Sequence, residues 1–579
     1  MNRLAELLPY FRRHRAQLVA GMGSNLGEAI LGLAAPIIIG SGIDALLQSF
    51  SSQLLLRYAG VLVGVTLLQG VFSFLKRRIL VAMSRDIEFE IRDRYFAHLE
   101  RMSQAFFQRN HTGDLMARGT NDLQAVRMLC GPAIMYSANT LFTACGALFF
   151  MIRIDGGLTL LALCALPFVA FVTKVFGQRI HKLFQDVQEQ FATMSMNVQE
   201  NLSGVRVIRA YAQEASSQTR FEGLNREYVE RSRHLIRWTA AFHPLLQGLI
   251  GLGFVAVLWY GGGLAAAGTI TVGQFVTFNF FLARLVWPMI AIGWVINLAQ
   301  RGSASWNRIL QILESEPEIA DSPECTQRQL DGQIAMANLS FTYAGQPQPA
   351  LQNIDLEVEA GSIVAIVGRT GAGKSTLLSL LCRLWDPPAG TLLYDGIDIR
   401  RYCLESLRRS VSVVPQETFL FSATLAENIA FGQPSASREE IRRVADIAGL
   451  EEDLAVLPNG LETRVGERGV TLSGGQKQRV ALARALLRKP RVLLLDDCLS
   501  AVDTRTEERI LGELEQEFSG RTVFLVSHRI STVQRADLIL VLDHGRIVER
   551  GDHRQLLVGN GIYADLHRRQ QLEEELATV

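Results

Sequence analysis

The chain has 579 residues, of which 48% are hydrophobic and 20% are charged, and its formal net charge is +1. Length alone suggests three or four soluble domains, but roughly the first 300 residues contain apolar stretches of about 20 residues, long enough to cross a bilayer. These stretches exclude a wholly soluble protein, and no nucleic-acid partner is expected.

The first half of the chain predicts six membrane-spanning helices, because six apolar stretches reach the length that a bilayer requires. Their approximate bounds are 17–40, 55–75, 130–152, 157–177, 244–266 and 272–298. The segments near 76–129 and 174–241 keep a helical period well past the bilayer. Long cytoplasmic extensions are therefore expected.

Positive charge is distributed unevenly among the loops. The segments 41–54 and 261–273 carry no Lys or Arg, and the turn at 152–157 carries only Arg153. The N-terminus instead carries Arg12, Arg13 and Arg15. By the positive-inside rule, we expect a multi-pass protein of the inner membrane with both termini in the cytoplasm.

Two charged residues lie near the middle of expected spans. Glu28 is in the first span and Arg284 is in the sixth. A central charge costs roughly 2.5–3.5 kcal/mol on the translocon scale, so such residues are candidates for function. The two side chains could pair with each other, or they could line the substrate path, and the sequence does not separate these alternatives.

The seven cysteines are scattered along the chain and show no metal-binding spacing. They are Cys130, Cys145, Cys164, Cys325, Cys382, Cys403 and Cys498. Their odd number and irregular spacing indicate neither a disulfide framework nor a metal site.

The chain divides into two expected domains joined by a linker. Pro317 and Pro323 interrupt regular structure between them. We therefore expect a transmembrane domain at 1–310, a linker at 311–332 and a second domain at 333–579.

The second domain opens with a pattern that favours phosphate binding. Residues 362–368 form a β-branched apolar run, which predicts a buried strand, and a glycine-containing loop and a helix follow it. Backbone N–H groups in such a loop surround phosphates, a lysine adds charge and a hydroxyl can hold Mg²⁺. An ordinary strand-to-helix turn is the alternative. The candidate residues are Gly368, Arg369, Thr370, Gly371, Ala372, Gly373, Lys374, Ser375 and Thr376.

Two later motifs add to this pattern. The run 492–495 predicts a strand that ends in Asp496, whose carboxylate is a candidate Mg²⁺ ligand or a plain strand-end aspartate. A glycine pair also opens an amphipathic helix, which provides a second anion site. The residues of this second site are Ser473, Gly474, Gly475 and Gln476.

In this order, the motifs resemble those of the ABC transporter superfamily. The region 336–557 resembles its nucleotide-binding domain, and 472–476 resembles its LSGGQ signature. The resemblance implies an α/β P-loop ABC domain that binds ATP and Mg²⁺. It also implies that an all-α six-helix transmembrane domain with long cytoplasmic extensions precedes this domain.

The resemblance assigns roles to four further residues. It places an adenine platform at Tyr343, a Q-loop glutamine that also contacts Mg²⁺ at Gln416, a D-loop residue at Asp503 and a switch histidine at His528. A half-buried strand residue, a turn residue and a satisfied strand-end histidine are the plainer alternatives for Tyr343, Gln416 and His528. The expected metal ligands are Ser375, Gln416 and Asp496.

One position departs from the family pattern. Asp497 stands where the family has a glutamate that polarises the attacking water, and its side chain is one methylene shorter. A base must approach its proton within about 2.6–3.2 Å, and a misplacement near 1 Å can lower the rate roughly a hundredfold. Asp497, His528 and Gln416 are therefore the expected catalytic residues of a slow site.

Three other passages resemble elements of ABC exporters. Those at 106–122 and 198–214 resemble intracellular loops, which implies coupling helices near 112–118 and 208–214. The passage 463–469 resembles the exporter X-loop. Turns between packed helices and a charged surface turn are the plainer interpretations.

The sequence thus predicts a half-size type IV exporter that works as a dimer and moves hydrophobic or amphipathic cargo, drugs or lipids. An intact signature beside a weakened site favours a heterodimer with a second half-transporter, and a homodimer with two slow sites is the alternative. A lipid A type flippase, supported only by Arg284, and an ATP-gated channel or regulatory subunit are the rival functions.

Overall fold

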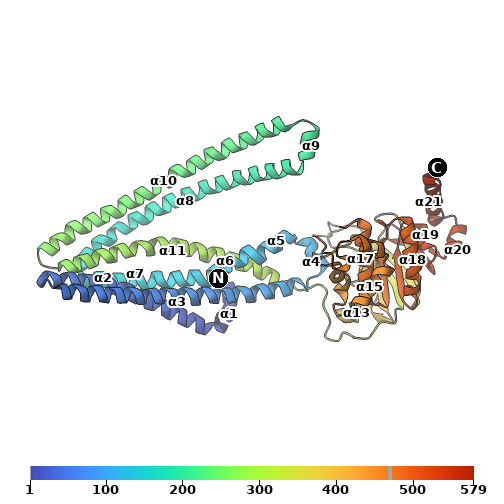
Figure 1. Cartoon of the computed structure of the whole chain (residues 1–579), viewed down its shortest axis with the longest axis horizontal. Coiled ribbons are helices and arrows are strands. Elements are labelled where there is room, and N and C mark those ends of the chain that lie inside the picture. The colour runs from blue at the N-terminus through green and yellow to red at the C-terminus, as the bar shows by residue number, and fades with distance from the viewer. Residues whose placement is uncertain (1, 467–471, 579) are drawn as a thin grey trace. The chain divides into compact units, whose positions relative to one another are not determined.

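A computed structural model describes the backbone of residues 2–466 and 472–578 (Figure 1). Within these ranges, the side chains of 2, 165–167, 169, 170, 290, 504 and 573–578 are not described. The chain forms two compact units. The first is Met1–Ala97 with Leu115–Glu314, and the second is His98–Asp114 with Ser315–Val579.

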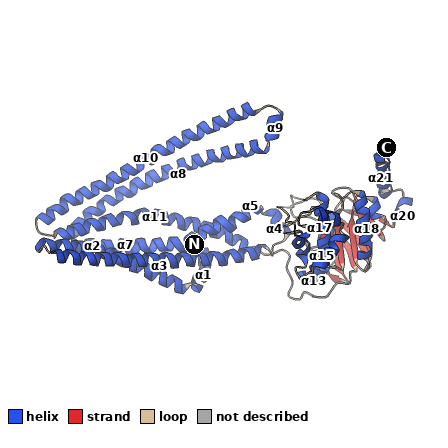
Figure 2. Ribbon diagram, viewed as in Figure 1, coloured by secondary structure: helices blue, strands red, loops and turns tan. Residues whose placement is uncertain are grey.

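The first unit is built of helices (Figure 2). A 3₁₀ turn at Asn2–Leu7 precedes them, and π-helical turns at Arg118–Asp122 and Leu129–Ala133 flank α6. The helices are α1 (Leu8–Arg13), α2 (Arg15–Gln48), α3 (Ser52–Leu99), α5 (Thr112–Ala117), α6 (Leu123–Met128), α7 (Ile134–Ile154), α8 (Gly156–Ser203), α9 (Val205–Ala210), α10 (Glu214–Ala266) and α11 (Val272–Leu313).

Five helices in the described part of the chain are long and apolar enough to cross a membrane. They are Arg15–Gln48, Ser52–Leu99, Thr112–Ile154, Glu214–Ala266 and Val272–Leu313. Each contains one of the expected spans. The remaining expected span, 157–177, lies in α8, where the side chains of 165–167, 169 and 170 are outside the described residues.

Small residues and a partly buried carboxylate join α2 to α11. Asp44 Oδ1 accepts a hydrogen bond from the backbone N–H of Gly273 at 2.7 Å, and Asp44 Oδ2 accepts one from Thr271 Oγ1 at 2.5 Å. A Cβ on Gly273 would lie 2.0 Å from the carbonyl oxygen of Gly40. Only glycine therefore lets the two backbones approach this closely at that point.

Helices α8 and α10 form a long hairpin closed by α9 (Figure 1). They have 48 and 53 residues, which at 1.5 Å per residue correspond to about 72 and 80 Å, well beyond a hydrocarbon core of about 30 Å. Gln190 Nε2 donates to the carbonyl of Leu224 at 2.9 Å, and Arg231 donates to that of Asp186 at 3.0 Å. The expected long extensions are therefore present.

The second unit contains two sheets. The four-stranded sheet has the order β2-β1-β4-β5, and the six-stranded sheet has the order β10-β9-β3-β8-β7-β6. The strands are β1 (Ile334–Phe341), β2 (Leu351–Val358), β3 (Ile363–Gly368), β4 (Leu392–Tyr394), β5 (Ile397–Asp398), β6 (Val411–Val414), β7 (Val492–Asp496), β8 (Thr522–Val526), β9 (Leu538–Asp543) and β10 (Arg546–Gly551).

Helices accompany these sheets (Figure 2). They are α4 (Gln104–Arg109), α12 (Lys374–Leu381), α13 (Leu404–Ser410), α14 (Leu425–Ile429), α15 (Arg438–Ile447), α16 (Glu451–Val456), α17 (Gly474–Leu487), α18 (Thr504–Phe518), α19 (Ile530–Val533), α20 (His553–Val558) and α21 (Ile562–Thr578), with short 3₁₀ turns at Ile399–Arg401, Ala430–Gly432 and Gly460–Glu462. The fold class expected from sequence, a helical membrane domain followed by an α/β domain, is confirmed.

Strand direction positions the candidate site. Strands β3, β6, β7, β8 and β9 are parallel, and all five residues of β7 are buried. Asp496 pairs in register with Val526 at the ends of β7 and β8. Because the carboxyl ends of parallel strands meet at one edge of a sheet, the residues that follow β3, β7 and β8 converge there.

The segment 311–332, which was expected to be a linker, is hydrogen-bonded to the second unit. Its first three residues are helical, because α11 extends through Leu313. Thr326 forms a parallel bridge with Tyr402 and accepts a hydrogen bond from the N–H of Cys403 at 2.9 Å. Asp321 Oδ1 accepts one from the N–H of Leu404 at 2.7 Å.

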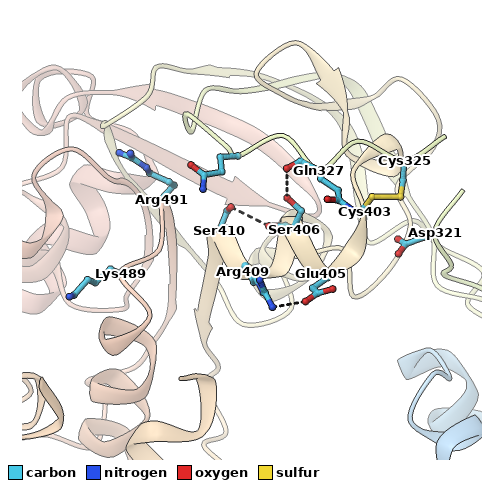
Figure 3. A pocket seen from close by; sticks show the side chains of 11 residues that line it. Asp321, Cys325, Gln327, Cys403, Glu405, Ser406, Arg409, Ser410, Lys489 and Arg491 are labelled. Carbon is cyan, nitrogen blue, oxygen red and sulfur yellow. Dashed lines mark hydrogen bonds and ion pairs between the residues drawn. A yellow bond between two sulfur atoms is a disulfide. The ribbon is translucent and has the colours of Figure 1, made fainter. Parts of the chain in front are cut away.

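The prediction of no disulfide was wrong, because Cys325 and Cys403 are bonded, with Cα atoms 4.9 Å apart (Figure 3). They are separated by 78 residues, and the bridge between their neighbours Thr326 and Tyr402 brings them together. No local spacing could indicate such a pair. The disulfide lies beside a cavity of about 550 Å³ that Arg409 also lines.

Candidate functional site

One cavity of about 320 Å³ lies at the carboxyl edge of the six-stranded sheet. The phosphate loop, the Q-loop, the ends of β7 and β8 and the strand-end histidine all contribute to it. Its lining residues are Tyr343, Ala350, Thr370, Gly371, Gly373, Lys374, Ser375, Thr376, Gln416, Asp496, Asp497, Val526 and His528. The structure thus brings together most of the residues that the motifs singled out.

The phosphate loop requires its glycines. Gly368 has φ 151° and Gly373 has φ 101°, in the region that side chains disfavour. A Cβ on Gly368 would lie 2.2 Å from the carbonyl oxygen of Leu542, and one on Gly373 would lie 2.6 Å from that of Ala350. The loop therefore curls tightly against neighbouring backbone before Lys374 opens α12.

Lys374 points its ammonium group back into this loop. Nζ donates to the carbonyl oxygens of Gly368 at 2.7 Å and Arg369 at 3.0 Å. Burial lowers the pKa of Lys374, while the carboxylates of Asp496 and Asp497 oppose that shift. A bound polyphosphate would add negative charge beside this buried ammonium group and would favour its charged form.

Asp496 is the buried carboxylate of the cavity. Its pKa is raised, first by burial and further by the charge of Asp497, although a hydrogen bond from Ser375 lowers it. Mg²⁺ prefers hard oxygen ligands, usually one or two carboxylates together with substrate phosphates. Ser375 and Asp496 fit that donor set, and a divalent cation would compensate the buried charge.

Asp497 follows directly and adopts a left-handed backbone conformation with φ 49°. Its N–H donates to the carbonyl of Val526 at 3.0 Å, and its own carbonyl accepts from Ser500 Oγ at 2.9 Å. These bonds hold the residue between β8 and the loop that follows β7. Asp497 and His528 both line the cavity, from adjacent strand ends.

Tyr343 lines the cavity beside the phosphate loop. Its hydroxyl donates to Thr376 Oγ1 at 3.1 Å, and its ring packs edge-to-face against Trp385 with centroids 4.9 Å apart. An aromatic ring held in this way offers a flat surface for a nucleotide base. Trp385 was not singled out by the motifs.

The signature residues do not line this cavity. Ser473 caps α17 by accepting from the N–H of Gln476 at 3.2 Å, and Gln476 Oε1 accepts from the N–H of Ser473 at 2.9 Å. Gly475 packs closely on Ala501, whose carbonyl oxygen would be 2.7 Å from an added Cβ. Asp503 caps α18 instead. The residues of the predicted second anion site therefore lie outside this cavity.

Sequence reasoning missed a buried acidic residue beside the histidine loop. Glu507 on α18 forms an ion pair with Arg529 and accepts from Thr532 Oγ1 at 2.5 Å. Arg529 also donates to the carbonyl of Val502 at 3.2 Å. A second cavity of about 270 Å³ is lined by Glu507, Arg529 and Thr532 together with Asp497. No motif or period distinguishes Glu507 from other helical glutamates.

Comparison with known proteins agrees with this geometry. Residues 18–289 match the family described as ABC transporter transmembrane region, and residues 351–500 match the ABC transporter family. The chain is 38% identical to YheI of Bacillus subtilis, a probable multidrug resistance ABC transporter ATP-binding/permease protein, over 97% of this chain and 96% of that protein. The chain belongs to the ABC transporter family.

This ABC transporter has further relatives of similar length. It is 36% identical to the multidrug resistance-like ATP-binding protein MdlA of Escherichia coli, over 100% of this chain and 98% of that protein. It is 32% identical to the ATP-dependent lipid A-core flippase of Syntrophus aciditrophicus, over 100% and 96%. A solved bacterial Atm1-family ABC exporter with ATP bound matches with TM-score 0.79 and 29% identity, over 96% of this chain and 98% of that one.

The transporter is therefore a half-size type IV ABC exporter and an ATPase, with one membrane domain and one nucleotide-binding domain. The two segments expected to be coupling helices fall at α5 and α9, which end at Ala117 and Ala210. The second thus begins and ends earlier than 208–214. Of the expected X-loop, residues 467–469 lie outside the described residues.

The membrane domain of this ABC transporter gives Glu28 a partner other than Arg284. Glu28 on α2 pairs with Lys76 on α3, and both side chains are largely buried. Arg284 on α11 instead lies against α2, where a Cβ on Gly32 would be 2.5 Å from its guanidinium nitrogen and 3.3 Å from Gln69 Nε2. Lys76 was not singled out because it lies just beyond the second expected span.

Proposed function

We propose that this chain is one half of a dimeric exporter, most readily a heterodimer, that moves hydrophobic or amphipathic molecules outward and contributes a slow ATP site. The observation that carries the proposal is the composition of the cavity. Asp497 lines it where the family has glutamate, while the chain's own signature, Ser473–Gln476, lies elsewhere. A partner's signature would complete this site, and this chain's signature would complete the partner's.

The residues of the cavity divide the work of phosphoryl transfer. Lys374 would neutralise charge on the phosphoryl oxygens, and Ser375 and Asp496 would hold Mg²⁺, which would supply further positive charge at the phosphates. Gln416 and His528 orient the γ-phosphoryl group and the attacking water. Asp497 accepts a hydrogen bond from that water less closely than glutamate would, because its carboxylate is set back by roughly one carbon–carbon bond of 1.5 Å.

Dimerisation is supported by the α8–α10 hairpin. Below the expected span it exposes large apolar side chains, including Phe184 (49% exposed), Phe191 (53%) and Leu202 (69%). Such a surface in water indicates a protein contact. ATP can then drive transport only through a higher affinity for one arrangement of the assembled dimer than for the other.

The proposal can be tested by purifying the complex from its own organism through a tag on this chain. Its native mass and its subunit content are then measured. A second chain of similar size with glutamate after its Walker B aspartate is the expected result. A complex that contains only this chain would contradict the heterodimer, and Asp497 would then have to support turnover at both sites.

A lipid flippase is the second candidate function. Arg284 forms no ion pair among the described residues, and its guanidinium lies against Gly32 between helices α2 and α11. A free cation at this depth would favour a cargo with an anionic headgroup. ATPase stimulation by anionic lipids that is lost in Arg284→Gln, with stimulation by neutral amphiphiles retained, would support it. Equal stimulation of both proteins would exclude Arg284 as a headgroup contact.

A further inference from the structure

The C-terminal helix reaches the loop that carries the switch histidine. Gln570 on α21 uses both ends of its side-chain amide there. Its Nε2 donates to the backbone carbonyl of His528, and its Oε1 accepts from the backbone N–H of Ile530 at 2.7 Å. The carbonyl can only accept and the N–H can only donate, so the hydrogen bonds fix the orientation of this amide.

The Ile530 N–H is a backbone donor that the local sequence leaves without a partner. It opens the four-residue helix α19, and the preceding residue, Arg529, provides no side-chain cap. The first N–H groups of a helix need partners from outside the helix. Gln570, distant in sequence, supplies one of them while it also restrains the carbonyl of His528.

The body of α21 is anchored independently of this contact. Tyr563 is fully buried in a cluster with Val367, Ile530 and Val533, and its hydroxyl lies 2.7 Å from His553 Nδ1. Gln570 lies about two turns further along the helix and is itself only half-buried. The helix would therefore stay in place when the Gln570 side chain is replaced.

We infer that Gln570 is a positioning residue of the ATPase site, which holds the His528 main chain so that its imidazole faces the γ-phosphate side of the cavity. Gln570 is not among the residues that line the cavity, and it reaches the site through the main chain of His528. Glu507 restrains the next residue, Arg529, through an ion pair. The two contacts together restrain the main chain of His528 and the side chain of Arg529.

Three variants test this role. Gln570→Ala removes both hydrogen bonds, and Gln570→Glu keeps an acceptor for Ile530 but places a carboxylate against the carbonyl of His528. Gln571→Ala is the matched control, because Gln571 is an exposed glutamine on the same helix whose side chain makes no hydrogen bond to the described residues. All three are made in the full-length exporter.

The readouts separate binding from turnover on this chain. Photolabelling with an azido-ATP analogue at 0 °C reports binding, and vanadate-dependent trapping of the label reports turnover. Gln570→Ala should lower the trapping rate about tenfold to a hundredfold, as expected for a misplaced catalytic group. Binding should change less than about twofold, since the interaction is made to the histidine loop and not to bound nucleotide. Gln570→Glu should fall between alanine and wild type.

Two further measurements connect the effect to His528. Hydrogen exchange at the Ile530 amide should accelerate in Gln570→Ala and stay unchanged in Gln571→Ala. Adding Gln570→Ala to His528→Ala should lower trapping by less than about twofold, because residues that act through one group are not additive.

The inference is overturned if trapping by Gln570→Ala stays within about twofold of wild type, or if binding and trapping fall together as they would after general damage. The same variants are also made in a protein that carries Asp497→Glu, so that slow turnover at the wild-type site does not hide a loss of trapping. A failure of Asp497→Glu to raise turnover would count against the slow-site proposal alone, since the exchange of Ile530 and the ratio of trapping to binding still report on Gln570.

Discussion

Glu28 and Lys76 form a largely buried ion pair between α2 and α3 of the membrane domain, with side-chain exposures of 16% and 8%. Removing one member of such a pair leaves an uncompensated buried charge, which typically lowers the free energy of unfolding by about 3–5 kcal/mol. Replacing both members by residues of similar volume is often close to neutral. The pair is therefore a sensitive point for stability.

We expect Glu28→Gln and Lys76→Met each to lower the thermal unfolding temperature of the detergent-solubilised transporter more than the double variant does. Thermal unfolding of the four proteins measures this directly. Cargo-stimulated ATPase activity is the control for a transport role. If the double variant is stable but prefers different cargo, the pair contacts the substrate and is more than structural.

Asp497→Glu should raise ATP turnover at this chain's site, because the longer side chain moves the carboxylate toward the attacking water. An increase of roughly tenfold or more is expected from the distance dependence of base catalysis. Vanadate trapping on this chain measures it, and Asp497→Asn, which has the same length without the charge, is the matched control. Equal trapping by the aspartate and glutamate proteins would remove the physical basis of a slow site.

Asp496 gives a prediction about pH. Its pKa is raised chiefly by burial, so the folded protein holds this proton more tightly than the unfolded chain. The corresponding stabilisation is present below the unfolded pKa and is lost as pH rises through the folded pKa. Nucleotide-free Asp496→Asn should therefore unfold at a higher temperature than wild type at pH 7.5, and the difference should shrink toward pH 4.

The same variant should lose the thermal stabilisation that Mg²⁺ adds to ATP. Because stabilisation by a ligand follows its affinity for the folded state, wild type should gain a larger shift with Mg²⁺–ATP than with ATP and EDTA. Asp496→Asn should show similar shifts in both. A full Mg²⁺-dependent shift in the variant would exclude Asp496 as a metal ligand.

The cysteine bond predicts a thiol count. Among the described residues five cysteines are free, so a chain denatured without reductant should expose five reactive thiols, and seven after reduction. Cys325→Ser with Cys403→Ser should expose five under both conditions. Seven thiols in freshly purified, unreduced wild type would mean that the pair is reduced in the cell, as is usual for cytosolic proteins.

The sequence predicted the parts of this protein whose chemistry is local. The turn from β3 to α12 was predicted because Gly371, Gly373 and Lys374 follow one another, and the membrane helices were predicted because their apolar runs are continuous. Both signals can be read from a short, continuous stretch of sequence. Their physical causes are the backbone freedom of glycine and the burial of apolar side chains in lipid, and neither depends on a partner residue far away in the sequence.

The contacts that were missed join positions that are far apart in sequence. Glu28 meets Lys76 through helix packing, Cys325 meets Cys403 through one β-bridge, and Gln570 meets His528 through the return of α21. Nothing in the local sequence of a glutamine or a cysteine specifies such a partner. These contacts follow only once the fold has brought the segments together.

The length of the α8–α10 hairpin has a mechanical consequence. Two helices that are hydrogen-bonded to each other behave as one stiff beam, with α9 at its tip (Figure 1). Over about 75 Å of helix, a tilt of about 10° at the membrane end would displace α9 by about 13 Å. A slight rearrangement among the membrane helices would therefore produce a large displacement of α9 at the tip of the hairpin.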